Sequence, residues 1–108
     1  MSFDAMAAAT DWLDAYRARN IHAMLDMYAD NAVVECGCGG TKIITGGDAL
    51  RTYWEQRLKD YPASELDSLH PLGDGATISY VTRTGVVSAI LEFDKEGRIA
   101  ALRCGPSN

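Results

Sequence analysis

The chain has 108 residues, and 47% of them are hydrophobic, which is enough for one domain with a core of its own. The formal net charge is −5 without a lysine or arginine cluster, and no apolar run approaches the roughly 20 residues that cross a bilayer, so nucleic acid and membranes are excluded as expected partners. No signal peptide is predicted, and the odd number of three cysteines favours free thiols in a reducing cytoplasm over a disulfide framework.

Helical spacing of apolar residues predicts three helices in the N-terminal half of the chain. Ser2 is expected to cap the first helix, which stops near Arg19, and Asn20 to cap the second. Asp48, behind two glycines, is expected to cap the third, which Pro62 closes. The apolar stripes of the three helices are Met6, Ala9, Leu13 and Tyr16 with Trp12 at the edge; Ile21, Met24, Leu25 and Tyr28; and Leu50, Tyr53, Trp54, Leu58 and Tyr61.

Short segments rich in β-forming residues predict strands between and after these helices. They cover residues 32–36, 42–45, 64–72, 76–83, 86–93 and 98–104. A loose hairpin tip is expected at 37–40 and a tight turn at Thr84-Gly85. The order predicts an α+β fold in which three N-terminal helices pack on one face of a curved, mainly antiparallel sheet. No linker divides the chain, so residues 1–108 are expected to form a single domain with a pocket between helices and sheet.

The segments YADNAVVE, ITGGDALRTYWEQRL and FDKEGRIAALRCG, in this order and spacing, resemble the nuclear transport factor 2-like superfamily. Within it the chain looks most like SnoaL-like proteins and ketosteroid isomerase. The resemblance covers roughly residues 8–105 and implies a cone-shaped, cystatin-like barrel with a deep apolar pocket, usually in a homodimer. The superfamily includes isomerases, dehydratases, polyketide cyclases, epoxide hydrolases and non-enzymatic binders, so the fold alone does not give the function.

A comparison with the catalytic residues of ketosteroid isomerase argues against steroid isomerisation. That family uses an aspartate base with a tyrosine and a protonated aspartic acid as oxyanion donors. The resemblance places these positions at Cys36, Trp12 and Ala89. Proton abstraction beside a ketone needs a base and a donor to the enolate, and these three side chains do not supply that pair.

Strand alternation and helix periodicity predict which side chains line the pocket of a fold of this kind. The expected wall is largely aromatic and apolar with few polar points, as in pockets for small apolar molecules. For each aromatic residue, simple packing in the core is an equal alternative. The expected ligand-binding residues are Trp12, Tyr16, Tyr28, Cys36, Trp54, His70, Tyr80, Thr82, Ala89 and Cys104.

The cysteines and His70 are the candidates for chemistry. Cys36 could be a nucleophile activated by His70, and either residue is a candidate catalytic base. A metal site would use Cys36, Cys38, Cys104 and His70, but Cys-x-Cys is not the usual zinc spacing, so no metal and no cofactor are expected. Buried thiols that act as small hydrophobes are the competing interpretation. Arg57 is expected to be a solvated helix residue, or else to reach the pocket rim and hold a carboxylate.

Three functional hypotheses follow from these observations. The first is a pocket protein that binds a small, largely apolar ligand. The second is a lyase, hydrolase or polyketide-cyclase-like enzyme that uses His70, Cys36 or a tyrosine in proton transfer. The third is a dimeric interaction module. Val81, Ile90 and Ile99 are expected on the outer face of the sheet, beside charged residues, which predicts a homodimer through that face.

Overall fold

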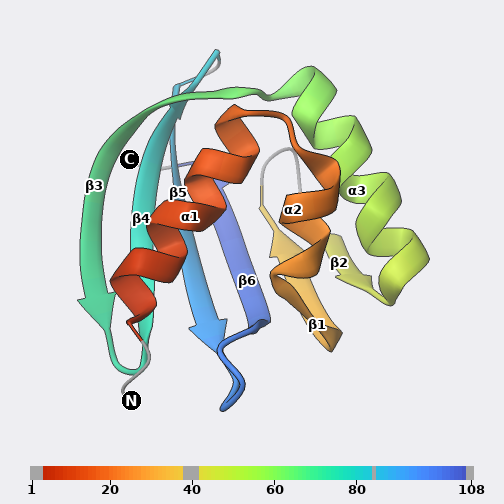
Figure 1. Ribbon diagram of the computed structural model, residues 1–108. Helices are drawn as coiled ribbons and strands as arrows, with labels where there is room; N and C mark the ends of the chain where they lie inside the picture. The colour runs from red at the N-terminus through yellow and green to blue at the C-terminus, as the bar shows by residue number, and fades with distance from the viewer. Residues whose placement is uncertain (1–3, 38–41, 84, 107–108) are drawn as a thin grey trace.

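A computed structural model describes residues 4–37, 42–83 and 85–106, which form three helices and one six-stranded sheet (Figure 1). The helices are α1 (Ala5–Arg17), α2 (Ile21–Asp26) and α3 (Gly47–Asp60). The strands are β1 (Tyr28–Cys36), β2 (Lys42–Thr45), β3 (Ala63–Leu72), β4 (Gly75–Thr82), β5 (Gly85–Phe93) and β6 (Ile99–Pro106). The expected hairpin tip at 37–40 lies largely outside the described residues, as does Thr84 of the expected turn before β5.

The sheet is mixed and open, with the strand order β2-β1-β6-β5-β4-β3. β1 runs parallel to β6, whereas the other neighbouring strands pair antiparallel. The predicted α+β class and the mainly antiparallel sheet are therefore confirmed. The barrel implied by the resemblance is corrected, because β2 and β3 lie at opposite edges of the sheet and do not pair with each other.

Local capping explains where the helices begin. The carboxylate of Asp4, not Ser2, caps α1 and accepts hydrogen bonds from the N–H groups of Met6 and Ala7 at 3.0 and 3.2 Å. Asn20 caps α2 as predicted. Gly46, whose φ of 90° suits glycine, precedes α3, and Asp48 lies in the first turn instead of at the cap, where a carboxylate still favours the helix dipole.

All three helices lie on the same side of the sheet, and the core fills the space between them (Figure 1). Its centre is a group of five rings, each at most 4% exposed, which we call the aromatic cluster: Trp12, Tyr16, Tyr28, Trp54 and Tyr80. The rings meet edge to face: the Trp12 centroid lies 5.6 Å from both Tyr16 and Tyr80 and 5.8 Å from Trp54. Such ring contacts add to the stability that burial gives. No helix in the described part of the chain is long and apolar enough to span a membrane.

Candidate functional site

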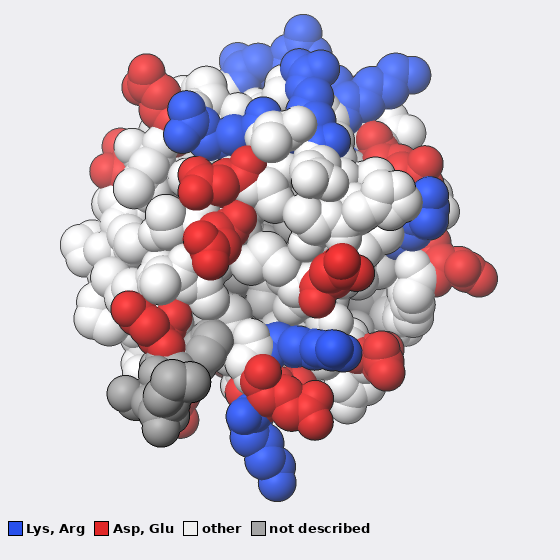
Figure 2. Space-filling model, in the orientation of Figure 1, with Lys and Arg blue, Asp and Glu red and all other residues white. Residues whose placement is uncertain are grey.

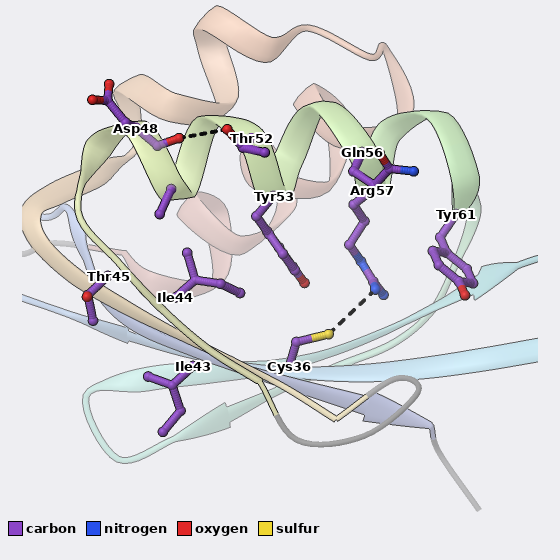
Figure 3. Close-up of a pocket in the computed structure, with 11 residues that line it drawn as sticks. Cys36, Ile43, Ile44, Thr45, Asp48, Thr52, Tyr53, Gln56, Arg57 and Tyr61 are labelled. Atoms are coloured by element: carbon purple, nitrogen blue, oxygen red, sulfur yellow. Dashed lines mark hydrogen bonds between the residues drawn. The ribbon is translucent and has the colours of Figure 1, made fainter.

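A cavity of about 750 Å³ lies between α3 and the β1–β2 edge of the sheet, open to solvent along one side (Figure 3). We call it the α3 groove. Its wall is formed by one face of the helix, and its floor by the edge of the sheet. The residues that line it are Cys36, Ile43, Ile44, Thr45, Asp48, Ala49, Thr52, Tyr53, Gln56, Arg57 and Tyr61.

Two faces of α3 have different surroundings: one packs against the core, and the other lines the groove. Leu50, Trp54 and Leu58 are buried and anchor the helix against the core. Ala49, Thr52, Tyr53 and Gln56 follow i, i+3, i+4, i+7 spacing and form a second stripe along the groove. Because β2 has only four residues and is an edge strand, the sheet wall that faces this second stripe is short.

Arg57 provides the buried charge of the site. Its side chain is only 4% exposed, yet it lines the groove, and its guanidinium points from α3 towards the sheet (Figure 3). Nη1 lies 3.9 Å from the Cys36 sulfur, and Cζ lies 5.2 Å from the centre of the Tyr61 ring. Burial alone would lower the pKa of Arg57, but the hydroxyls of Tyr80 and Tyr53 nearby more than offset this effect and raise the pKa. The guanidinium is therefore charged at every physiological pH.

Two thiols lie side by side beneath Arg57. Cys36 on β1 and Cys104 on β6 are Cα partners, and both are buried free cysteines. The Cys104 sulfur lies 3.6 Å from the Tyr53 hydroxyl. Hydrogen bonding to Cys36, followed by burial, raises the pKa of Cys104, so this thiol keeps its proton at neutral pH. Burial also raises the pKa of Tyr53. At neutral pH Tyr53 and Cys104 can donate hydrogen bonds, but neither of them can act as a base.

Most of the residues expected to bind a ligand build the interior instead. The five rings of the aromatic cluster fill the space where the sequence predicts an internal cavity, and none of them lines the α3 groove. Rings from α1, α3 and β4 contact one another across that space. Alternation along a strand predicts which side chains point inward, but not whether they meet. Ala89 is fully buried, and the Thr82 hydroxyl donates to the Gly85 carbonyl at 2.9 Å. Of the expected set, Cys36 alone lines the groove, with Cys104 directly behind Tyr53.

The expected inward position of His70 is wrong. The register of β3 shifts between Leu66 and Ser68, after which Leu69 pairs with the inward Ile78 and His70 pairs with Thr77. A one-residue shift moves every later side chain to the other face of the strand. His70 is consequently exposed on the outer side, and it cannot activate Cys36. The metal site that combined His70 with the thiols loses this ligand for the same reason, and Cys38 lies outside the described residues.

The structure decides between the two expectations for Arg57. The side chain is buried and lines the groove, which excludes a solvated helix residue and agrees with the alternative that it reaches the pocket. One signal was available in the sequence: Arg57 follows Tyr53 and Trp54 at i+4 and i+3, so it shares the side of α3 that faces the sheet.

Comparisons with known proteins place this architecture in a family. The model of the SnoaL-like domain matches residues 9–102. The chain belongs to the SnoaL-like family. A SnoaL-like protein of unknown function from Burkholderia thailandensis E264 superposes with a TM-score of 0.83 at 20% identity, over 96% of this chain and 95% of that chain. A protein from Kribbella flavida DSM 17836 gives 0.78 at 24% identity, over 96% and 87%. At these identities the solved structures show the SnoaL-like fold alone. No curated protein matches the sequence.

Proposed function

We propose that this SnoaL-like protein binds a small, largely apolar molecule in the α3 groove. The observation that carries the proposal is the groove itself, whose volume of about 750 Å³ falls within the range of small-molecule sites. Ile43, Ile44, Ala49 and the ring of Tyr53 supply apolar wall, and polar side chains line the groove towards its two ends, among them Asp48 at one end and Arg57 at the other. A site built in this way gives affinity through burial of the ligand and orientation through a small number of polar contacts.

Proton transfer is a second candidate function, favoured by the contact between Arg57 and Cys36. A guanidinium beside a thiol stabilises the thiolate, which would make Cys36 the base or nucleophile of a small lyase, hydrolase or cyclase. Tyr53, whose raised pKa keeps it protonated, would then donate a hydrogen bond to negative charge that develops on the substrate. Binding remains the stronger proposal, because it needs only the groove and no second ionised group.

Amide chemical shifts test the binding proposal directly. We expect titration with 1-octanol, a neutral amphiphile, to shift the resonances of α3 and β2 and leave those of the β3–β4 hairpin unchanged. The α3–β2 edge is the region where octanol would contact the groove lining. Chemical-shift changes spread evenly over the chain, or no change at octanol concentrations near the solubility limit, would contradict the proposal.

We also propose a symmetric homodimer through the outer face of the sheet. Val81, Val86 and Ile90 are half-buried, and their side chains project from the outer face. Arg103, the Cα partner of Ile90, forms an ion pair with Glu35 at 3.4 Å, so an apolar centre lies beside charged groups. Ile99, expected on this face, is instead fully buried in the core.

Light scattering tests the dimer. We expect a dimer mass for the wild type and a monomer mass for Ile90→Lys, with an unchanged circular dichroism spectrum, because a charge would be buried without a partner at the centre of the face. A monomer mass for the wild type would contradict the proposal.

A cytoplasmic location is also proposed, from the cysteine count. The chain has three cysteines, an odd number that favours thiols in a reducing compartment over a disulfide framework.

A further inference from the structure

We propose that the ligand of the α3 groove is a monocarboxylic acid with an apolar tail, and that Arg57 binds its carboxylate. This inference deepens the proposed function and rests on it.

The geometry of Arg57 suits a carboxylate. The guanidinium carries five N–H donors in a planar fork that matches the two oxygens of a carboxylate. Its contact with the Cys36 sulfur at 3.9 Å uses a weak acceptor, and the guanidinium also interacts with the hydroxyls of Tyr16 and Tyr80. Arg57 forms part of the groove wall, where its Cζ lies over the Tyr61 ring. A carboxylate in the groove is a stronger acceptor than a thiol or a tyrosine hydroxyl, so it can compete for these donors.

Three groups that interact with Arg57, namely Tyr53, Tyr80 and Cys104, contribute polar contacts but no negative charge at neutral pH. The Asp60 carboxylate of the same helix accepts a hydrogen bond from Gln56 of the groove wall. Burial raises the pKa of both Tyr53 and Tyr80, and hydrogen bonding to Cys36 together with burial raises that of Cys104. These three groups therefore remain protonated at pH 7. A carboxylate placed here meets a positive charge and a tyrosine hydroxyl that can donate to it, in a site where burial strengthens both interactions.

The two ends of the groove differ in charge along the axis of α3. Asp48 lies at the other end, nine residues before Arg57, which corresponds to about 13 Å along the helix axis. The exposed Asp48 carboxylate disfavours an anion at that end, whereas Ile44 and Ala49 add apolar surface to the groove wall away from Arg57. The charges at the two ends therefore orient an amphiphilic acid, with its carboxylate at Arg57 and its tail towards β2 and Asp48.

Basic residues surround the Arg57 end of the groove. The ends of α1 and α3 meet there, where the Tyr16 hydroxyl donates to the Tyr61 carbonyl at 2.5 Å. Arg17 and Lys59 lie in the last turns of these helices, and Arg83 donates to the Asp60 carbonyl. Figure 2 shows Lys and Arg side chains gathered along the edge where Figure 1 places these helix ends. Such a rim attracts anions from solution.

Helix dipoles offer a competing explanation for part of this pattern. Basic residues commonly stabilise the C-terminal turn of a helix, which accounts for the exposed Arg17 and Lys59. That explanation does not require Arg57 to be 4% exposed or to form part of a groove wall. Burial of a guanidinium is unfavourable because the charge loses its hydration. Arginines are buried in this way at sites that bind anions, where the anion compensates the loss.

Calorimetric titration of octanoate against 1-octanol and methyl octanoate, at pH 7.5 and low salt, tests the inference. The three probes share one tail and differ in charge. We expect the wild type to bind octanoate about tenfold more tightly than either neutral probe, and Arg57→Met to abolish this preference while octanol affinity stays within about twofold. Arg51→Met is the matched control: it makes the same substitution at an exposed arginine of α3 that is not among the groove-lining residues, and it should keep the preference.

The possible outcomes separate the inference from the proposed function. Equal binding of all three probes by the wild type would leave groove binding intact and overturn the preference for an acid. Binding of none of the probes would overturn both. If Arg57→Met does not fold, Arg57→Lys replaces it, and the expected result is a weaker preference that falls steeply with salt. A variant at Arg57 that folds and keeps the full preference for octanoate would overturn the role of Arg57.

Discussion

Two adjacent residues of α3, Tyr53 and Trp54, belong to regions with opposite character. Their ring centres are 5.3 Å apart, yet Trp54 is fully buried in the aromatic cluster and Tyr53 lines the open α3 groove. Trp54 meets rings from α1, whereas Tyr53 faces a short edge strand. The comparison teaches that an aromatic side chain closes a space only where another element supplies the opposing wall. The same residue type can therefore build a core or a pocket.

Removal of a ring from the aromatic cluster is expected to give the largest effect. Trp54→Ala should lower the free energy of unfolding by about 3–5 kcal/mol, because a fully buried indole in contact with Trp12 and Tyr16 leaves a cavity. Urea denaturation followed by circular dichroism measures this loss. Tyr53→Ala is the matched control, and we expect a smaller loss since its ring borders solvent. Equal losses would contradict the distinction between the two regions.

The sequence could predict the helices and strands because their periodicities are local. The stripe Ile21, Met24, Leu25 and Tyr28 and the Asn20 cap predict a helix here without any tertiary information. The helix is shorter than predicted, because α2 ends at Asp26 and Tyr28 already belongs to β1. The open sheet could not be predicted in this way, because barrel closure depends on whether the edge strands β2 and β3 meet. The predicted caps of α1 and α3 each differ from the observed caps by two residues. Helix ends are commonly uncertain by this much, because neighbouring residues can serve as alternative caps.

The site was less predictable than the fold. Alternation identified Ala89 and Tyr80 as inward residues, and both are fully buried, but it could not show that rings would fill the space between them. The inward position of His70 depended on regular pairing of the strand, and a register shift near Asp67 breaks that pairing. Pro71 signals an edge strand or a bulge in this segment, but it does not give the position of the shift. Arg57 was underestimated because its burial depends on the neighbouring sheet edge, and helix periodicity alone does not reveal that edge.

Overpacking the interior is the next largest effect. Ala89 is fully buried between Ile78 and Cys104, its Cα partners on β4 and β6. Ala89→Phe should lower the free energy of unfolding by about 1–3 kcal/mol, because a closed core has no room for a ring. Thermal and urea unfolding both report the change. Unchanged stability would mean that the interior holds space for a ligand, and the aromatic cluster would no longer count as a packed core.

Alkaline pH should weaken both regions in turn. The pKa of Cys104 in the groove region, and those of Tyr28 and Tyr80 in the cluster, are raised above ordinary values of 9.0 and 10.0. The unfolded chain loses these protons first, so the stabilisation is complete below about pH 9 and falls as pH rises above it, by about 1.4 kcal/mol per pH unit for each group. Urea midpoints at about pH 7.5 and about pH 10.5 measure the fall. Tyr28→Phe should reduce it, and an unchanged pH dependence in that variant would contradict the assignment.

The smallest expected effect on stability comes from the same substitution made in the groove. Ala49 is exposed on the groove face of α3, so Ala49→Phe should change the free energy of unfolding by only about 0.5 kcal/mol, mainly through helix propensity. Its ring nevertheless enters the groove at the end where the apolar tail is expected and should weaken octanoate and octanol binding alike. Ala89→Phe and Ala49→Phe then form a pair: the first damages the fold, and the second blocks the site in a stable protein. If Ala49→Phe is stable and binds both probes as tightly as the wild type, the ligand does not lie in the α3 groove.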